Sequence, residues 1–229
     1  FVAYSSLYIK NLENERYKMN GLINKVNTKY NITDKKITDL KFHIDNLVPK
    51  DVCKYFIDFY ENNSKHALDE NSYKYKTNKI EDDNFKCINL TTNSLENKIF
   101  IEPLELAKRY INIMITNYVL HIQNNICPIF NSLHLRDSFN IRILKYEKGQ
   151  YIKDHTDMGL NTIRASCTLN LNEDYEGGEF RFFDGQIKHS FKTGDAMIFP
   201  AEPIWIHGTE PITKGTRYAI NCFLRTGGI

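Results

Sequence analysis

The sequence lacks the features that mark several common protein classes. Its 229 residues include only five cysteines, Cys53, Cys87, Cys127, Cys167 and Cys222, and no two of them form a Cys-x-x-Cys pair. An odd number of widely spaced cysteines argues against a disulfide framework and against a structural zinc site. We therefore expect a reducing compartment.

Long apolar runs are also missing. No stretch reaches the roughly 18 apolar residues of a membrane span, and residues 1–10 lack the layout of a signal peptide. With 30 basic and 28 acidic residues, the net charge is only +2, which gives no case for a nucleic-acid partner. We expect a cytoplasmic protein that binds neither membranes nor nucleic acid; its oligomeric state stays open.

The chain has no internal repeat and no low-complexity tract, and its length suits one large domain or two small ones. Residues 1–38 are polar with scattered apolar positions, a pattern that permits a helix with one apolar stripe. We interpret them as a helical extension or as a linker within a longer protein. The main domain is expected over residues 39–229.

The first half of this domain is predicted to be largely helical. A short strand at residues 42–44 precedes a helix that Pro49 opens. A longer helix over residues 103–124 has a wide apolar face, which is expected to pack against a sheet. Between them, residues 64–98 are predicted to form a long irregular connection with short strands, either a functional lid or a solvated loop.

After residue 128, apolar residues recur at every second position, which is the period of a half-buried strand. Asp184-Gly185 predicts a two-residue hairpin turn. Helices followed by many short strands indicate an α+β fold, a double-stranded β-helix (cupin-like jelly roll) with a supporting layer of N-terminal helices. Beyond a strand at 139–144, further strands are predicted at 163–171, 180–183, 187–191, 196–199, 204–207 and 217–224.

The residues suited to chemistry concentrate in one stretch. His155-Thr156-Asp157 is followed by His207, 50 residues after Asp157, and by Arg217 ten residues later. On an extended segment His155 and Asp157 point to the same side, because side chains alternate. With His207 brought in from a distant strand, they form the facial triad of non-haem Fe(II) sites, which leaves positions open for a co-substrate and dioxygen.

Two further residues suit a co-substrate in that cavity. A 2-oxo acid can chelate iron through its keto oxygen and C1 carboxylate, and a far carboxylate on the same molecule then needs a cation, ideally a planar guanidinium. Arg217 begins the strand after the loop from His207, so it can face the same cavity. Tyr146 precedes a turn at Gly149 and can supply a phenol to the same ligand.

In order and spacing, these residues resemble the catalytic domain of the prolyl 4-hydroxylase group of 2-oxoglutarate and Fe(II)-dependent dioxygenases. The close resemblance covers about residues 139–225, and the catalytic core is expected over about 139–226. It rests on Tyr146, Gly149, His155-Thr156-Asp157, Asn172, Glu176-Gly177-Gly178-Glu179, Gly194 to Pro200, His207, and Pro211 to Tyr218.

The resemblance implies a role for each central residue. His155, Asp157 and His207 would bind Fe(II). Arg217 would pair with the C5 carboxylate of 2-oxoglutarate, and these four residues would form the catalytic set. Tyr146 would assist at the co-substrate.

Less central positions follow from the same resemblance. Asn221, four residues after Arg217, would line the co-substrate pocket. Asn170 stands where relatives often carry a tyrosine, and its amide, with Thr168, is expected to take over hydrogen bonding to the co-substrate. Arg164 and Trp205 are candidates for substrate binding; the alternatives are a salt bridge at a strand edge for Arg164 and a wall of the barrel mouth for Trp205.

The implied reaction is hydroxylation of a substrate C–H bond by dioxygen, coupled to decarboxylation of 2-oxoglutarate to succinate and CO2, with ascorbate supporting activity. The expected substrate is a prolyl residue of a peptide or protein, with residues 64–98 and 158–163 as walls of its groove. Alternatives are another substrate (a free amino acid, a lysyl residue or a nucleobase) or a non-catalytic jelly-roll binding module. The spacing of Arg217, Asn221 and Arg225 does not fit nucleobase demethylases, and the intact triad argues against a non-catalytic module.

Overall fold

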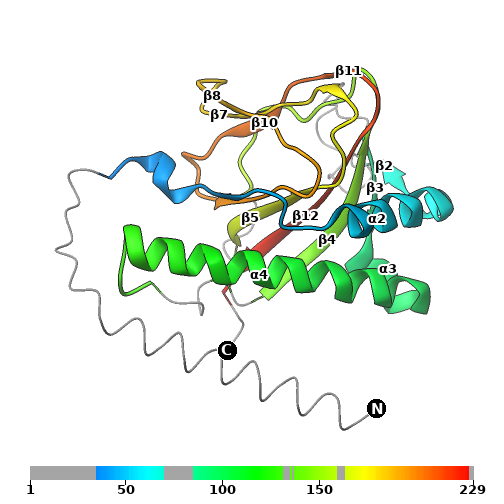
Figure 1. Cartoon of the computed structure of the whole chain (residues 1–229), viewed down its shortest axis with the longest axis horizontal. Helices are drawn as coiled ribbons and strands as arrows, with labels where there is room; N and C mark the ends of the chain where they lie inside the picture. The colour runs from blue at the N-terminus through cyan, green and yellow to red at the C-terminus, as the bar shows by residue number, and fades with distance from the viewer. Residues whose placement is uncertain (1–34, 70–84, 131–134, 136, 159–162, 227–229) are drawn as a thin grey trace, which may run out of the picture. The chain divides into compact units, whose positions relative to one another are not determined.

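A seven-stranded antiparallel sheet forms the main layer of the structure, a computed structural model that describes residues 35–69, 85–130, 135, 137–158 and 163–226 (Figure 1). The three longest strands lie side by side in its centre. Across the sheet the order is β1 (Phe42–Ile44), β9 (Ala196–Pro200), β5 (Ile163–Asn170), β12 (Arg217–Arg225), β4 (Asp137–Tyr146), β3 (Lys86–Asn89) and β2 (Leu68–Asp69).

Two smaller sheets lie on the side of the main sheet that faces away from the long helix (Figure 1). One consists of β10 (His207–Thr209), β7 (Phe180–Phe182) and β8 (Ile187–His189), and the other of β11 (Ile212–Lys214) and β6 (Glu176–Gly177). An aromatic cluster that includes Phe182 and Phe199 fills the space between β7 and the main sheet. The two layers are those of the predicted jelly roll.

Helices cover the other face of the main sheet (Figure 1). They are α2 (Lys50–Asn62), α3 (Leu90–Glu96) and α4 (Ile101–Asn125), with 3-10 turns at Ile37–Leu40, Ser64–His66 and Lys98–Phe100. Pro103 lies in the first turn of α4, where the missing N–H removes no helical hydrogen bond. One stripe of α4 is buried in the core against the sheet: Leu104, Ala107, Ile111, Met114, Tyr118 and Ile122.

Most predicted elements are confirmed, but the connection over residues 64–98 is not irregular throughout. β3 is one of the short strands expected there, whereas α3 was not predicted; this helix begins where the Asn89 side chain accepts a hydrogen bond from Thr92 N–H at 3.0 Å. A helix of seven residues is too short to show a clear period in the sequence. Residues 70–84, the middle of this connection, lie outside the described residues.

Three details of the strand prediction are wrong. The strand predicted at 204–207 begins only at His207, and the very short strands β6 and β11 were not predicted. The hairpin at Asp184-Gly185 exists, but its loop has four residues, because Phe182 pairs with Ile187. Strands of two or three residues show no alternation that a sequence pattern can detect.

The predicted extension over residues 1–38 lies almost wholly outside the described residues, so the domain division stays a prediction. Among the helices of the described ranges, none has both the length and the apolar character that a membrane span requires.

Two histidines meet where β1 approaches β8. The rings of His43 and His189 lie edge to face with centroids 4.4 Å apart; His43 Nε2 lies 3.5 Å from Asp195 Oδ2, and in the described part of the chain His189 Nε2 has no hydrogen-bond partner. Burial, and then the nearby positive charges of His43 and Lys41, lower the pKa of His189 to about 4. The folded protein therefore keeps His189 neutral at pH values where the unfolded chain protonates it.

This arrangement predicts a loss of stability in acid. Since the folded pKa of about 4 lies below the ordinary histidine value of about 6.5, the free energy of unfolding decreases as the pH falls from about 6.5 to about 4. The rings of His189 and Phe191 have centroids 4.6 Å apart. His189→Phe keeps an aromatic ring at this contact and removes the group that is protonated. The free energy of unfolding is measured by urea unfolding for His189→Phe and for wild type at both pH values. The difference, variant minus wild type, should be more positive at pH 4.5 than at pH 7.5. The same relative change in His66→Phe, whose ring contacts Phe100, would contradict this origin.

The buried stripe of α4 allows a matched test of helix packing. Ile111 is 0% exposed, whereas Ile113 on the same helix is 44% exposed. Ile111→Ala should lower the free energy of unfolding by about 2–5 kcal/mol, because it leaves a cavity against the sheet. Ile113→Ala should cost less than about 1 kcal/mol. Similar losses in chemical denaturation would show that α4 does not pack as described.

Candidate active site

The backbones of His155 and His207 are paired directly. His155 N–H donates to His207 O at 2.9 Å, and His207 N–H donates to His155 O at 2.9 Å, forming an antiparallel bridge. The bridge places the two imidazole rings side by side, with centroids 4.4 Å apart. Main-chain hydrogen bonding thus brings together two residues that are distant in the sequence.

Gly208 allows the two segments to approach. A Cβ atom at this position would lie 2.7 Å from both Asp154 Oδ1 and Ile152 O, so no side chain fits. Gly208 was not predicted as a site residue. A glycine directly after a predicted ligand on a strand was the available signal, because glycine in a strand often marks a close backbone approach.

The Asp157 carboxylate completes the triad. Its Oδ1 lies 3.3 Å from His155 Nε2, and its Oδ2 lies 3.3 Å from His207 Nε2. One ligand atom from each of the three residues lies within 4.8 Å of the others. The side chains of Asp157 and His207 are 8% and 4% exposed, whereas that of His155 is 38% exposed. The three donors therefore converge, and the cluster opens to solvent on the His155 side.

Hydrogen bonds to the main chain define the tautomers of both histidines. His155 Nδ1 lies 2.8 Å from Lys153 O, and His207 Nδ1 lies 2.9 Å from Trp205 O. A carbonyl oxygen only accepts, so each Nδ1 carries a proton and each neutral imidazole has its lone pair on Nε2. Two lone pairs and a carboxylate then face one another, and a divalent cation satisfies all three. The residues fit a metal ion, and a carbonyl behind each imidazole is typical of metal-binding histidines.

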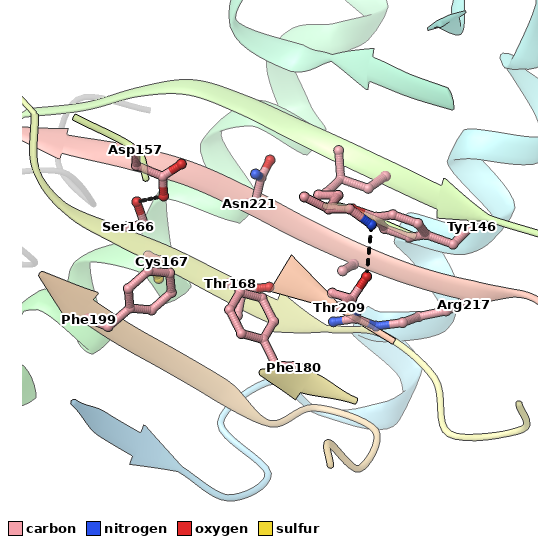
Figure 2. A pocket seen from close by; sticks show the side chains of 13 residues that line it. Tyr146, Asp157, Ser166, Cys167, Thr168, Phe180, Phe199, Thr209, Arg217 and Asn221 are labelled. Atoms are coloured by element: carbon pink, nitrogen blue, oxygen red, sulfur yellow. Dashed lines mark hydrogen bonds between the residues drawn. The ribbon is translucent and has the colours of Figure 1, made fainter. Parts of the chain in front are cut away.

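Asp157 is ionised in this setting. Burial raises the pKa of its carboxyl, but His155 and His207, when their Nε2 atoms are protonated, donate hydrogen bonds and bring positive charge that outweigh burial and hold the pKa well below its usual range. The Ser166 hydroxyl, on β5, also donates to Asp157 Oδ2 (Figure 2). Ser166 was not predicted as a site residue, and it orients the carboxylate for a metal.

A pocket extends from this triad across the inner face of the main sheet. In Figure 2, Asp157 and Ser166 lie at one end, Arg217 and Tyr146 lie at the other, and Asn221 is between them. These side chains come from the central strands β4, β5 and β12 and from the segment before β5. The other walls include Leu144, Ile152, Thr168, Phe180, Phe199 and Thr209.

Arg217 is a buried cation, 2% exposed. Its Nε donates to Asn170 Oδ1 at 3.1 Å, and its guanidinium carbon lies 5.6 Å from the Tyr146 ring centroid and 5.7 Å from that of Phe191. Within the described ranges, no carboxylate pairs with it. Two aromatic rings and one amide oxygen hold the guanidinium in place, and its outer nitrogens remain for an anion.

Asn170 has a different role from the one expected. Its NH2 group donates to Asn172 O at 2.5 Å and to Lys192 O at 3.2 Å, and its Oδ1 accepts from Arg217 and from the Tyr175 hydroxyl. Both amide hydrogens are therefore used, and none remains for a co-substrate. The prediction that Asn170 donates to the co-substrate is therefore wrong. Asn170 instead accepts from Arg217 and orients its guanidinium.

The remaining predicted residues divide into two groups. Tyr146, Thr168 and Asn221 line the pocket, and their contact with a co-substrate stays a prediction. Trp205 is 2% exposed and packs against Phe182, Phe183 and Phe199, so the structure contradicts the prediction that it contacts substrate. Arg164 is exposed on β5, two residues before Ser166 and on the same face, so it stays a candidate near the triad.

Comparison with known proteins identifies related sequences. Residues 141–225 match the family model of the 2OG-Fe(II) oxygenase superfamily. A PKHD-type hydroxylase of Idiomarina loihiensis is 34% identical over 87 residues, which cover 35% of this chain and 39% of the relative. A PKHD-type hydroxylase of Cupriavidus pinatubonensis is 30% identical over 125 residues, which cover 53% of this chain and 50% of the relative. The chain spans half or less of the length of these curated relatives.

Solved structures share the fold. A Pseudomonas putida prolyl-4-hydroxylase aligns with a TM-score of 0.58 and 15% identity, over 86% of this chain and 98% of the other. A Trichoplax adhaerens prolyl hydroxylase, in complex with a hypoxia inducible factor peptide fragment, aligns with a TM-score of 0.61 and 12% identity. The alignment covers 94% of this chain and 92% of the other. These matches confirm the predicted fold, and the family match confirms the resemblance to 2-oxoglutarate and Fe(II)-dependent oxygenases.

The triad predicts how metal binding depends on Asp157. Asp157→Asn keeps the shape of the side chain but removes its charge, and it should weaken Mn(II) binding by roughly a hundred-fold or more in isothermal titration calorimetry. Asp58→Asn is the matched control, because Asp58 is an exposed carboxylate paired with Lys54 on α2. Equal Mn(II) affinity in the two variants would exclude the triad as the metal site.

Proposed function

We propose that this chain is an Fe(II)- and 2-oxoglutarate-dependent dioxygenase that hydroxylates a prolyl residue of a peptide or protein and releases succinate and CO2. One observation carries this proposal: Asp157, which belongs to a cluster of three metal-ligand side chains, and Arg217, a buried cation without a carboxylate partner in the described residues, lie at opposite ends of one pocket. A dicarboxylate that chelates a metal at one end needs a cation at the other.

Each end of the pocket has its own task. His155, Asp157 and His207 would hold Fe(II), which supplies, together with 2-oxoglutarate and dioxygen, the oxidation that places a hydroxyl group on the substrate carbon. The outer nitrogens of Arg217 would bind the far carboxylate of 2-oxoglutarate as a bidentate pair. Ascorbate would support activity by keeping iron reduced.

The chain's apolar side chains would exclude water from the reacting groups. Leu144, Ile152, Phe180 and Phe199 line the pocket, so much of the carbon chain of a bound dicarboxylate would lie against hydrocarbon. Exclusion of water strengthens the pairing with Arg217. The Ser166 hydroxyl and the carbonyls behind both histidines would keep the metal donors in place.

The proposed substrate is supported by the open side of the triad and by the relatives. His155 is partly exposed, Met158 is 47% exposed, and Arg164 lies near this end of the pocket, so a polypeptide segment can reach the site. One aligned prolyl hydroxylase was solved with a peptide fragment. Residues 70–84 and 159–162, parts of the expected groove walls, lie outside the described residues. The cytoplasmic location stays a prediction.

The test is succinate production from 2-oxoglutarate with Fe(II) and ascorbate, with and without proline-rich peptides. Wild type should produce succinate that peptide stimulates, and the peptide should gain the mass of one oxygen atom. His155→Ala should reduce turnover at least a hundred-fold, because it removes a metal donor. His66→Ala, which removes an imidazole that contacts Phe100 outside the pocket, should retain most of the activity.

The other outcomes separate the alternatives. Turnover without stimulation by peptide would keep the dioxygenase and direct the search to free amino acids, lysyl residues or nucleobases. Absence of both turnover and Fe(II)-dependent 2-oxoglutarate binding would contradict the proposal and leave a non-catalytic binding module.

A further inference from the structure

A second buried guanidinium lies on the same inner face of the sheet. Arg142 is on β4, two residues before Leu144 and four before Tyr146, and both of these line the pocket. Side chains two residues apart on a strand share a face, so Arg142 extends this row. It is only 6% exposed. Burying a cation is costly unless the surroundings compensate it, so its contacts indicate what it is for.

The contact that matters is with Asn221, its cross-strand neighbour on β12. Arg142 Nε donates to Asn221 Oδ1 at 3.1 Å. A guanidinium has only donors, so the oxygen of the amide must face Arg142. The NH2 group of Asn221 therefore points away from Arg142. Asn221 also lines the pocket, between Asp157 and Arg217 (Figure 2).

An aromatic contact limits the movement of Arg142. Its guanidinium carbon lies 5.5 Å from the ring centroid of Phe223, two residues after Asn221 on β12. Phe223 in turn contacts Phe139 of β4, with ring centroids 5.8 Å apart. The guanidinium is thus held by an amide oxygen and an aromatic ring, both presented by β12.

We propose that Arg142 is a positioning residue that orients the Asn221 amide, so that its NH2 group donates to 2-oxoglutarate in the pocket. This rests on the function proposed above. An asparagine alone can present either its oxygen or its NH2 group to a ligand, and the oxygen would repel a carboxylate. Pairing the oxygen with Arg142 selects the donor before the ligand arrives, which is how second-layer contacts improve binding.

The test measures 2-oxoglutarate binding to Mn(II)-loaded protein by isothermal titration calorimetry, so it does not depend on turnover. Arg142→Met keeps much of the side-chain volume and removes the donor, and it should raise the Kd for 2-oxoglutarate roughly ten-fold. Arg225→Met is the matched control: its guanidinium lies 4.6 Å from the Phe139 ring centroid and pairs with Asp137, away from the pocket. Its Kd should stay within about two-fold of wild type.

A second variant protects the test against misfolding. Asn221→Asp retains an acceptor for Arg142 and gains an ion pair, so its melting temperature should not fall. It replaces the NH2 donor with a carboxylate oxygen, which repels 2-oxoglutarate, so its Kd should rise more than ten-fold. Wild-type affinity in Asn221→Asp would overturn the proposal even if Arg142→Met does not fold.

A double-mutant cycle separates positioning from a direct effect of charge. Because Arg142 acts through Asn221, the double variant Arg142→Met/Asn221→Ala should bind 2-oxoglutarate no more weakly than Asn221→Ala alone. Additive losses would overturn the positioning role, and so would wild-type affinity in Arg142→Met. If wild type itself shows no Mn(II)-dependent 2-oxoglutarate binding, the proposed function fails and the inference fails with it. If wild type binds 2-oxoglutarate and the variants bind it with the same Kd, only the inference fails.

Discussion

The reciprocal main-chain hydrogen bonds between His155 and His207 are the constraint on which the site depends. They join the segment before β5 to β10 and so bring the two imidazoles side by side. Gly208 permits this approach, since a Cβ atom there would collide with Ile152 O. Asp157 is then placed between the rings by its position two residues after His155. The backbone bridge thus brings the three side chains of the proposed metal site together.

The main sheet separates two tasks by the alternation of its strands. On β5, Ala165 and Leu169 pack into the core under the helices, whereas Ser166 and Thr168 line the pocket. The buried stripe of α4 supplies apolar contact for the outer face, so the inner face is free to carry polar groups. Stability and chemistry therefore occupy opposite faces of the same strands.

Buried charge is the cost of this arrangement, and the chain compensates it with amides and aromatic rings. Arg217 is held by Asn170 and lies near the rings of Tyr146 and Phe191. Arg142 follows the same pattern with Asn221 and Phe223. An amide oxygen fixes the Arg217 guanidinium without neutralising it, so positive charge remains there for an anionic ligand.

The fold class could be predicted from the sequence, because strand alternation is a local pattern, and the order and spacing of the motifs predicted that His155, Asp157 and His207 lie together; their role as metal ligands stays a prediction. The surroundings of Asn170, Trp205 and Arg142 are visible only in the tertiary structure. The partners of Asn170 include Lys192 and Arg217, and Trp205 is enclosed by Phe182 and Phe199, so neither role can be derived from neighbours in the sequence. Burial and hydrogen-bond partners depend on which strands are paired, and that pairing is a property of the whole sheet.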